Sequence, residues 1–215
     1  MPKKEIILKH VTILSSYLII FWGFYRFLFK LPEEIEETVI KPVFWLIPTF
    51  YFVSREGQGI SSLGLTFKKL FPVIYYSLGL GALFLGEALL INYLKYGNFE
   101  FGVELSQRVF IISLVLSLAT AISEEITFRG YIFTRIWKAL ENEWVSNILT
   151  TAIWTLIHIP ITFFVWKLDL TSSITYLLIT AIFGLGSSFV FARTKNIASS
   201  IFLHVLWEWP IILFR

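Results

Sequence analysis

Long apolar segments follow one another through almost the whole chain, and they limit its fold more than any other feature. A helix needs about 20 apolar residues to cross a bilayer, and in lipid its backbone polar groups must find partners inside the segment. We therefore expect seven helical segments, at 6–29, 39–54, 68–95, 105–127, 144–166, 171–193 and 196–214. The second is short and contains Pro42 and Pro48, so a kinked or partly inserted helix is expected there.

The composition supports a single integral-membrane domain over residues 1–215. The chain is 56% hydrophobic and 15% charged, with a mean hydropathy of +0.74, which lies outside the range of soluble domains. A different division of the third or seventh segment changes the count. The predicted fold class is therefore all-α, a polytopic transmembrane helical bundle of about seven to eight spans with membrane lipids as partners.

Cysteine content and charge exclude several functions. The chain has no cysteine, which excludes disulfides, thiolate metal sites and a cysteine nucleophile. Its net charge is +3 and its basic residues are scattered, so no nucleic-acid partner is expected. With the N-terminus inside, more of the 18 Lys and Arg residues fall on the cytoplasmic side than outside. The positive-inside rule thus predicts a multi-pass cell-membrane protein with a cytoplasmic N-terminus.

Ionisable side chains inside apolar segments are costly and are therefore candidates for function. They occur here as Glu87, as Glu124 and Glu125 with Arg129, as His158, and as His204 with Glu208. Two of the three histidines of the chain thus lie within predicted spans. This concentration predicts a buried polar site in the second half of the chain.

The two adjacent glutamates are expected to differ in role. Residues four apart share a helix face, so Glu125 faces Arg129 and can form an ion pair with it. Glu124 points roughly 100° away and has no cation nearby on its own helix. We interpret Glu125 as structural and Glu124 as free for chemistry.

The histidines follow the same four-residue spacing. His204 and Glu208 share one helix face, and Trp154 lies one turn before His158. With about 1.5 Å of rise per residue, both histidines and Glu124 can reach a common, partly sunken site. We expect that site to open to the cytoplasm.

Two chemistries suit such a set. Peptide hydrolysis needs an activated water, a proton donor for the leaving amine and stabilisation of the oxyanion, and a desolvated glutamate with histidines can supply these. Alternatively, Glu124, His158, His204 and Glu208 could be ligands of a zinc ion. The sequence has no HExxH motif, so the usual zincin arrangement is excluded.

Non-catalytic interpretations stay open for each group. A Glu–Arg pair at a helix end is commonly an interfacial salt bridge, and a single intramembrane histidine often forms an interhelical hydrogen bond. Glu87 could be a buried polar tie or part of a proton path in a small transporter. Against these stands the joint occurrence of glutamates and histidines at four-residue steps on three segments.

Three short motifs resemble a known family. "EEITFR" fits an EExxxR signature, "WTLIH" is similar to FxxxH, and "HVLWE" is similar to HxxxN. In this order they resemble the CPBP family, the CAAX-protease and bacteriocin-processing group also called Abi, which includes the Ras-converting type of prenyl endoprotease. The resemblance covers residues 105–210 and implies an all-helical intramembrane endopeptidase whose site opens to the cytoplasm.

The resemblance also implies roles for individual residues. Glu124 would activate a water, His158 would assist proton transfer, His204 and Glu208 would lie at the oxyanion, and Glu125 and Arg129 would support the site. The substrate would be a peptide or protein, with lipidated ones among the candidates. Family members have been called metalloproteases, but we favour a metal-free reaction with zinc as the alternative. The alternative function is a non-enzymatic immunity or scaffolding protein that retains the fold.

Two positions depart from the family pattern. Glu208 stands where the motif has Asn, and an ionised carboxylate cannot donate a hydrogen bond to an oxyanion. Glu208 would then be protonated, orient His204, or bind a metal or a cationic substrate group. Trp154 stands where the motif has Phe, which we interpret as the milder change.

Overall fold

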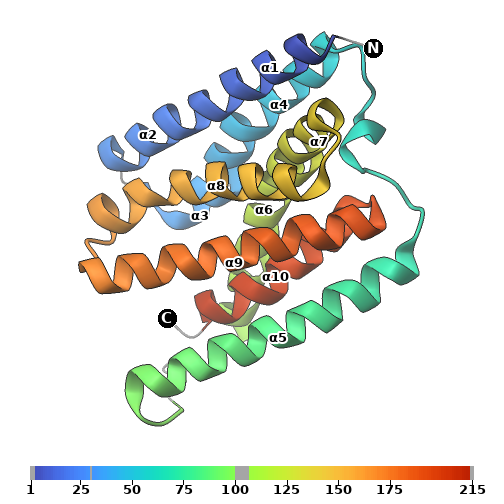
Figure 1. Ribbon diagram of the computed structural model, residues 1–215. Coiled ribbons are helices and arrows are strands. Elements are labelled where there is room, and N and C mark those ends of the chain that lie inside the picture. The colour runs from blue at the N-terminus through green and yellow to red at the C-terminus, as the bar shows by residue number, and fades with distance from the viewer. Residues whose placement is uncertain (1–2, 30, 100–106, 214–215) are drawn as a thin grey trace.

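The computed structural model describes residues 3–29, 31–99 and 107–213, and these contain helices and no strand (Figure 1). The helices are α1 Lys4–Tyr17, α2 Gly23–Leu28, α3 Glu33–Ile35, α4 Lys41–Arg55, α5 Leu70–Tyr96, α6 Gln107–Glu125, α7 Thr134–Leu140, α8 Glu143–Pro160, α9 Leu170–Thr194 and α10 Ile197–Leu213. Four π-helical segments continue some of them: η1 Leu18–Trp22, η2 Glu36–Ile40, η4 Ile126–Phe133 and η5 Ile161–Val165; η3, Ile60–Leu63, is a 3₁₀ turn. The predicted all-α class is confirmed.

Five stretches of helix within the described residues are long and apolar enough to cross a membrane. They are Lys4–Leu28, Leu70–Leu94, Val109–Leu140, Glu143–Val165 and Leu170–Thr194. The remaining predicted spans correspond to α4 and α10, which have only 15 and 17 residues. The predicted count of seven to eight spans is therefore not confirmed.

The helix predicted to end at residue 127 continues instead through η4 and α7 to Leu140. The sequence turns polar at Glu124, and this change suggested a membrane edge. In the structure the polar side chains that follow, Arg129 and Arg135, are buried and ion-paired inside the protein. Because these charges are neutralised inside the protein, the two arginines can be buried and the helix continues past them.

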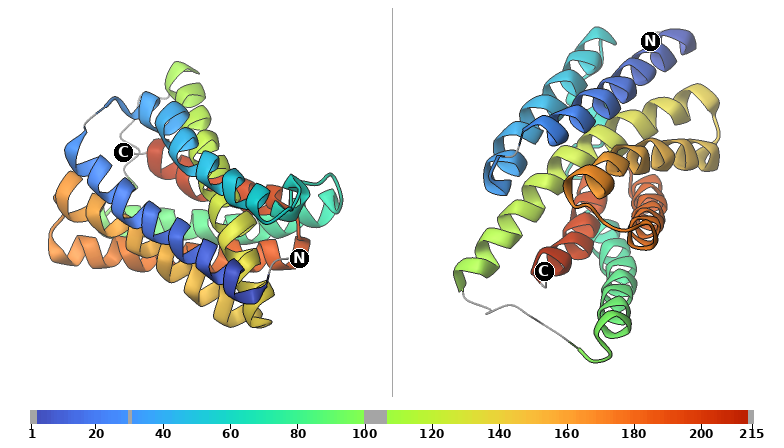
Figure 2. Two further views of the ribbon diagram at one scale, coloured as in Figure 1. Left: turned by 90° about the horizontal axis from the view of Figure 1, so that it is seen from above. Right: turned by 90° about the vertical axis from the view of Figure 1, so that its left-hand side faces the viewer.

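The α6–η4–α7 helix crosses the bundle, and the other helices pack around it (Figure 2). On one side α10 lies between α6 and α5, while on the other α1 contacts α7, and α4 contacts both α6 and η4.

Helices α8 and α9 form an antiparallel pair whose starts are capped by polar side chains. Asn142 Oδ1 accepts from the Val145 amide at 3.0 Å, and Asp169 Oδ1 from the Ser172 amide at 3.0 Å. Hydrogen bonds from the Ser172 hydroxyl and amide also lower the pKa of Asp169.

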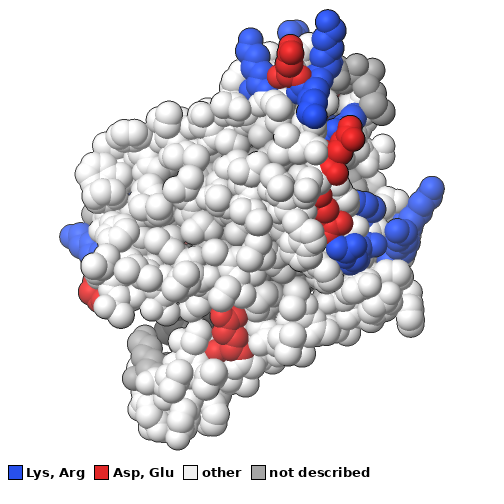
Figure 3. Space-filling view, viewed as in Figure 1, with Lys and Arg blue, Asp and Glu red and all other residues white. Residues whose placement is uncertain are grey.

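The two ends of the bundle differ in charge and in construction. The N-terminus lies at the same end as the C-terminus of α4, η3 and the α9–α10 turn (Figure 1). Glu56 ties this end together by accepting from Tyr131 Oη at 2.6 Å and Arg135 Nε at 2.8 Å. Most of the Lys and Arg side chains visible in Figure 3 gather there. We call this end of the bundle the N-terminal end. The end that holds the α2–α3 and η5–α9 connections is called the opposite end.

Candidate active site

Glu125 is the centre of the most deeply buried polar group. Arg129 Nη1 donates to Glu125 Oε1 at 3.0 Å, so the predicted i, i+4 ion pair is present. Both side chains are 0% exposed, which excludes an interfacial salt bridge. Ser187 donates to the second oxygen at 2.7 Å, and His204 Nδ1 lies 2.7 Å from the first. Glu125 therefore neutralises Arg129 and orients His204 at the same time.

Glu124 is paired with a cation that its own helix does not supply. Lys41 Nζ, at the start of α4, lies 2.9 Å from Glu124 Oε1. The indole Nε1 of Trp154, from α8, donates to Oε2 at 2.7 Å. The prediction of an unpaired Glu124 is thus wrong, because the partner comes from a segment 83 residues earlier in the chain. Each carboxylate oxygen keeps a further lone pair with which to accept a hydrogen bond from water.

Trp154 has a larger role than the sequence suggested. A phenyl ring at this position would pack but could not donate to Glu124, so the change from the family's Phe is not a mild one. The indole also packs edge-on against His158, with ring centroids 4.7 Å apart, and lies 6.0 Å from the ring of His204. Trp154 thereby holds Oε2 of Glu124 in place and packs against the rings of both histidines.

His158 is oriented through the backbone of its own helix. Its Nδ1 lies 2.8 Å from the carbonyl oxygen of Trp154, and a neutral imidazole in this geometry donates from Nδ1. Nε2 is then left as the nitrogen able to exchange a proton with water or substrate. η5 begins just beyond, after Pro160.

His204 and Glu208 share a helix face, as predicted, with Nε2 and Oε2 3.9 Å apart. This separation is too long for a hydrogen bond. Glu208 Oε2 is buried and has no hydrogen-bond partner among the residues that the structure describes. Because Nδ1 of His204 is engaged by Glu125, Nε2 can donate a hydrogen bond only in the doubly protonated imidazolium.

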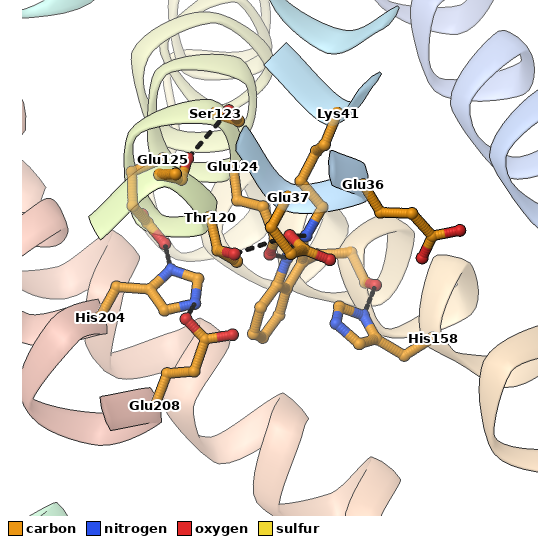
Figure 4. A network of polar contacts seen from close by, with 12 residues as sticks. Glu36, Glu37, Lys41, Thr120, Ser123, Glu124, Glu125, His158, His204 and Glu208 are labelled. Carbon is orange, nitrogen blue, oxygen red and sulfur yellow. Dashed lines mark hydrogen bonds and ion pairs between the residues drawn. The ribbon is translucent and has the colours of Figure 1, made fainter. Parts of the chain in front are cut away.

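A cavity of about 90 Å³ brings part of the predicted set together (Figure 4). Glu124, His158 and Glu208 line it, whereas His204 does not; it lies behind, held by Glu125. A buried water needs roughly 10–15 Å³ by this measure, so the cavity has room for several. Its wall also includes Lys41 and Glu37, which the sequence did not single out.

Three of the four π-helical segments contribute to the wall of this cavity. They do so through Trp22 of η1, Glu37 of η2 and Ile161 of η5. π-turns are rare and are frequently found at functional sites. Their gathering at one cavity is therefore independent support for its being the functional site.

The cavity opens at the opposite end of the bundle. Among its lining residues Arg26 lies in the last turn of α2, Glu33 begins α3 and Trp166 follows η5, and no described residue of the N-terminal end lines it. The sequence could not reveal this position, because helical rise gives a depth along each helix but not the end of the bundle at which a shared site lies. The cytoplasmic N-terminus and the opening of the site to the cytoplasm stay predictions.

The proposed zinc ligands are not arranged around a common point. The described residues contain no group of three or more His, Asp or Glu side chains placed to hold a metal ion. The reason is visible in the contacts: the Lys41 ammonium occupies one oxygen of Glu124, and Glu125 occupies Nδ1 of His204.

Glu87 is not brought to the site. It lies on α5, is half-buried and is not part of the cavity wall. The structure therefore does not bring Glu87 together with the central carboxylates.

Comparison with known proteins gives one family match. Residues 106–210 match the family model described as Rce1-like, type II CAAX prenyl endopeptidase. No curated protein and no solved structure matches the chain significantly. The matched range contains the EExxxR, WTLIH and HVLWE motifs, and therefore Glu124, His158 and His204. Over residues 106–210, the chain matches the CAAX protease (CPBP) family of endopeptidases.

Proposed function

We propose that this protein hydrolyses a peptide bond inside the membrane region by means of a water activated by Glu124. The observation that carries this proposal is that Glu124 and His158, both within the family-matched range, line one cavity with room for water. A carboxylate and an imidazole facing the same water are sufficient for general base and general acid catalysis.

The reaction divides into two proton transfers. Glu124 takes a proton from the water as the water oxygen bonds to the carbonyl carbon and the carbonyl electrons move onto oxygen. Collapse of the tetrahedral intermediate breaks the C–N bond, and the leaving nitrogen receives a proton from Glu124 with the assistance of His158. His204 lies behind the cavity wall, and as an imidazolium held by Glu125 it would stabilise the oxyanion through its positive charge.

We propose a metal-free reaction. The polarising charge that a zinc ion would supply is instead provided by the Lys41 ammonium, 2.9 Å from Glu124. The test is cleavage of a fluorogenic apolar peptide by protein purified in detergent, measured before and after dialysis against a chelator. We expect unchanged rates, and a loss that added zinc restores would contradict the metal-free reaction.

The substrate is proposed to carry an apolar chain. A groove of about 320 Å³ is lined by Ile19, Phe24, Phe27 and Phe164, and it shares Gly23 and Pro160 with the cavity wall. Its aromatic lining suits the chain of a lipidated peptide better than a polar segment. Gly23 and Pro160 therefore lie where the groove meets the cavity. A Cβ at position 23 would lie 3.1 Å from Pro160 Cγ, so a larger side chain there has little room.

Gly23→Val is therefore expected to narrow this junction. For an apolar peptide we expect kcat/KM to fall by at least about tenfold, since even one methylene in a hydrophobic pocket changes kcat/KM by roughly that factor. The matched control is Gly86→Val on α5, where a Cβ meets no atom within 4 Å. Equal kcat/KM in both variants would contradict the proposed entry path.

Cysteine labelling can determine the membrane side of the site, because the chain has no cysteine of its own. Positive charge at the N-terminal end supports a cytoplasmic position for that end, and we propose that the cavity opens on the other side of the membrane. In intact cells, a membrane-impermeant maleimide is expected to label Asp169→Cys but not Ser62→Cys until the cells are permeabilised. The reverse pattern would place the site at the cytoplasmic face and the N-terminus outside. Labelling of both in intact cells would contradict this description of the fold.

A non-enzymatic role that retains the fold is the alternative function. One observation favours it: Glu208 places a carboxylate, whose Oε2 has no hydrogen bond among the described residues, where the family pattern has an amide. It predicts that a Glu124→Ala protein keeps its cellular phenotype. The peptidase proposal predicts that the phenotype is lost together with cleavage.

A further inference from the structure

Lys41 lies outside the family-matched range, yet it is part of the cavity wall (Figure 4). Its side chain is 6% exposed, and its ammonium bridges two carboxylates, at 2.5 Å from Glu37 Oε2 and 2.9 Å from Glu124 Oε1. We propose that Lys41 is a positioning residue for Glu124, so that the N-terminal half of the chain completes the active site. This inference rests on the proposed peptidase function.

The surroundings hold Lys41 in a defined place. Glu37 Oε2 also accepts from Thr120 Oγ1 at 2.6 Å, and Glu37 Oε1 lies 3.6 Å from Arg26 Nη1. The Lys41 ammonium lies near two indole rings, 5.8 Å from that of Trp22 and 5.6 Å from that of Trp45. Glu37 and the two indole rings thus hold the Lys41 ammonium in a position where it contacts Glu124.

This arrangement gives Glu124 the charge state that a general base requires. A buried carboxylate without a counter-ion is expected to be neutral, and a neutral carboxyl group cannot accept a proton from water. An ammonium at hydrogen-bond distance stabilises the ionised form, while Trp154 fixes the second oxygen. Lys41 and Trp154 together therefore hold Glu124 charged and in one orientation.

The same ammonium balances charge through the reaction. As Glu124 takes the proton, negative charge leaves its carboxylate and appears on the substrate oxygen, so the total charge of the cavity is unchanged. Lys41 stays adjacent to this charge at every step. Lys41 can also offset the carboxylate of Glu208, which shares the cavity wall with it.

A structural role alone does not explain this cluster. Buried ion pairs can often be replaced by apolar side chains at little or no cost in stability. A lysine placed between two glutamates in the centre of a membrane protein, one of them the candidate base, therefore points to chemistry. The experiment must separate this role from a contribution to folding.

The test uses a charge-balanced double variant, Lys41→Met with Glu37→Gln, which removes one positive and one negative charge together. We expect kcat to fall by at least about 100-fold, as for loss of a key electrostatic group, with KM almost unchanged. Lys41→Arg keeps the charge and is expected to retain much more activity than Lys41→Met. Folding is followed by the melting temperature in detergent and by elution as a single species.

The matched control is Arg135→Met with Glu56→Gln, which removes a buried ion pair at the N-terminal end, away from the cavity. This variant is expected to lose stability but to keep the kcat of the folded fraction. A wild-type kcat in the Lys41→Met/Glu37→Gln protein would overturn the role of Lys41. The role would also be overturned if kcat fell in both double variants and the fall were fully explained by the loss of folded protein. If the wild type cleaves no peptide, the proposed function fails instead.

Discussion

Replacing Glu124 by glutamine is expected to abolish peptide cleavage while leaving the fold intact. Glutamine has the shape of glutamate and still offers one oxygen to Lys41 or Trp154, but it cannot take a proton from water. Loss of a general base lowers rates by about 10²–10⁴, and we expect at least a loss of about a thousandfold in kcat. The measurement is initial velocity on a fluorogenic apolar peptide, with products identified by mass spectrometry.

Glu87→Gln is the control for this prediction. Glu87 is also a glutamate in a membrane helix, but it does not line the cavity, so its variant is expected to cleave at the wild-type rate. Undiminished cleavage by both Glu124→Ala and His158→Ala proteins would exclude the proposed mechanism. Substrate-driven proton uptake by proteoliposomes that depends on Glu87 would instead support a transporter.

Arg129→Met is expected to cause the largest loss of stability of any single change near the site. Arg129 is fully buried, pairs with Glu125 at 3.0 Å and donates to the carbonyl of Gly184 at 3.1 Å. Removing one member of a buried pair leaves an uncompensated charge and costs about 3–5 kcal/mol. The measurement is the free energy of unfolding in detergent, obtained by denaturant titration.

Arg193→Met provides the comparison. Arg193 also forms an ion pair, with Glu143, but its side chain is 37% exposed, and pairs of this kind contribute about 0–1 kcal/mol. The Arg129→Met/Glu125→Gln protein is expected to be more stable than Arg129→Met alone, because it no longer buries an unpaired carboxylate. Equal stability of the Arg129→Met and Arg193→Met proteins would show that the buried pair is not essential to the fold.

Contacts within a single helix were predictable from spacing. Glu125 and Arg129, and His204 and Glu208, are each four residues apart, and the regular geometry of a helix places them on one face whatever surrounds it. The order of the three motifs likewise predicted the family, and apolar segment lengths predicted an all-helical fold. These features depend only on local geometry and on residue type.

Contacts between helices were not predictable in this way. The same spacing argument left Glu124 without a cation, because Lys41 approaches it from another helix. The hydrogen bond from Trp154 to Glu124 also joins two helices. The effect of having Trp instead of Phe at this position could therefore not be predicted from the sequence. The helix after Glu125 was predicted to end early, since its buried ion pairs could not be seen.

The sequence by itself determined that this chain forms a helical membrane protein with Glu124, His158 and His204 in a family-specific order. Only the tertiary structure decided which groups surround Glu124, which histidine faces the cavity and toward which end the cavity opens. The physical reason is that helix geometry relates residues a few positions apart. The packing of α4, α8 and α10 against α6 and η4 depends on side chains distributed over the whole chain.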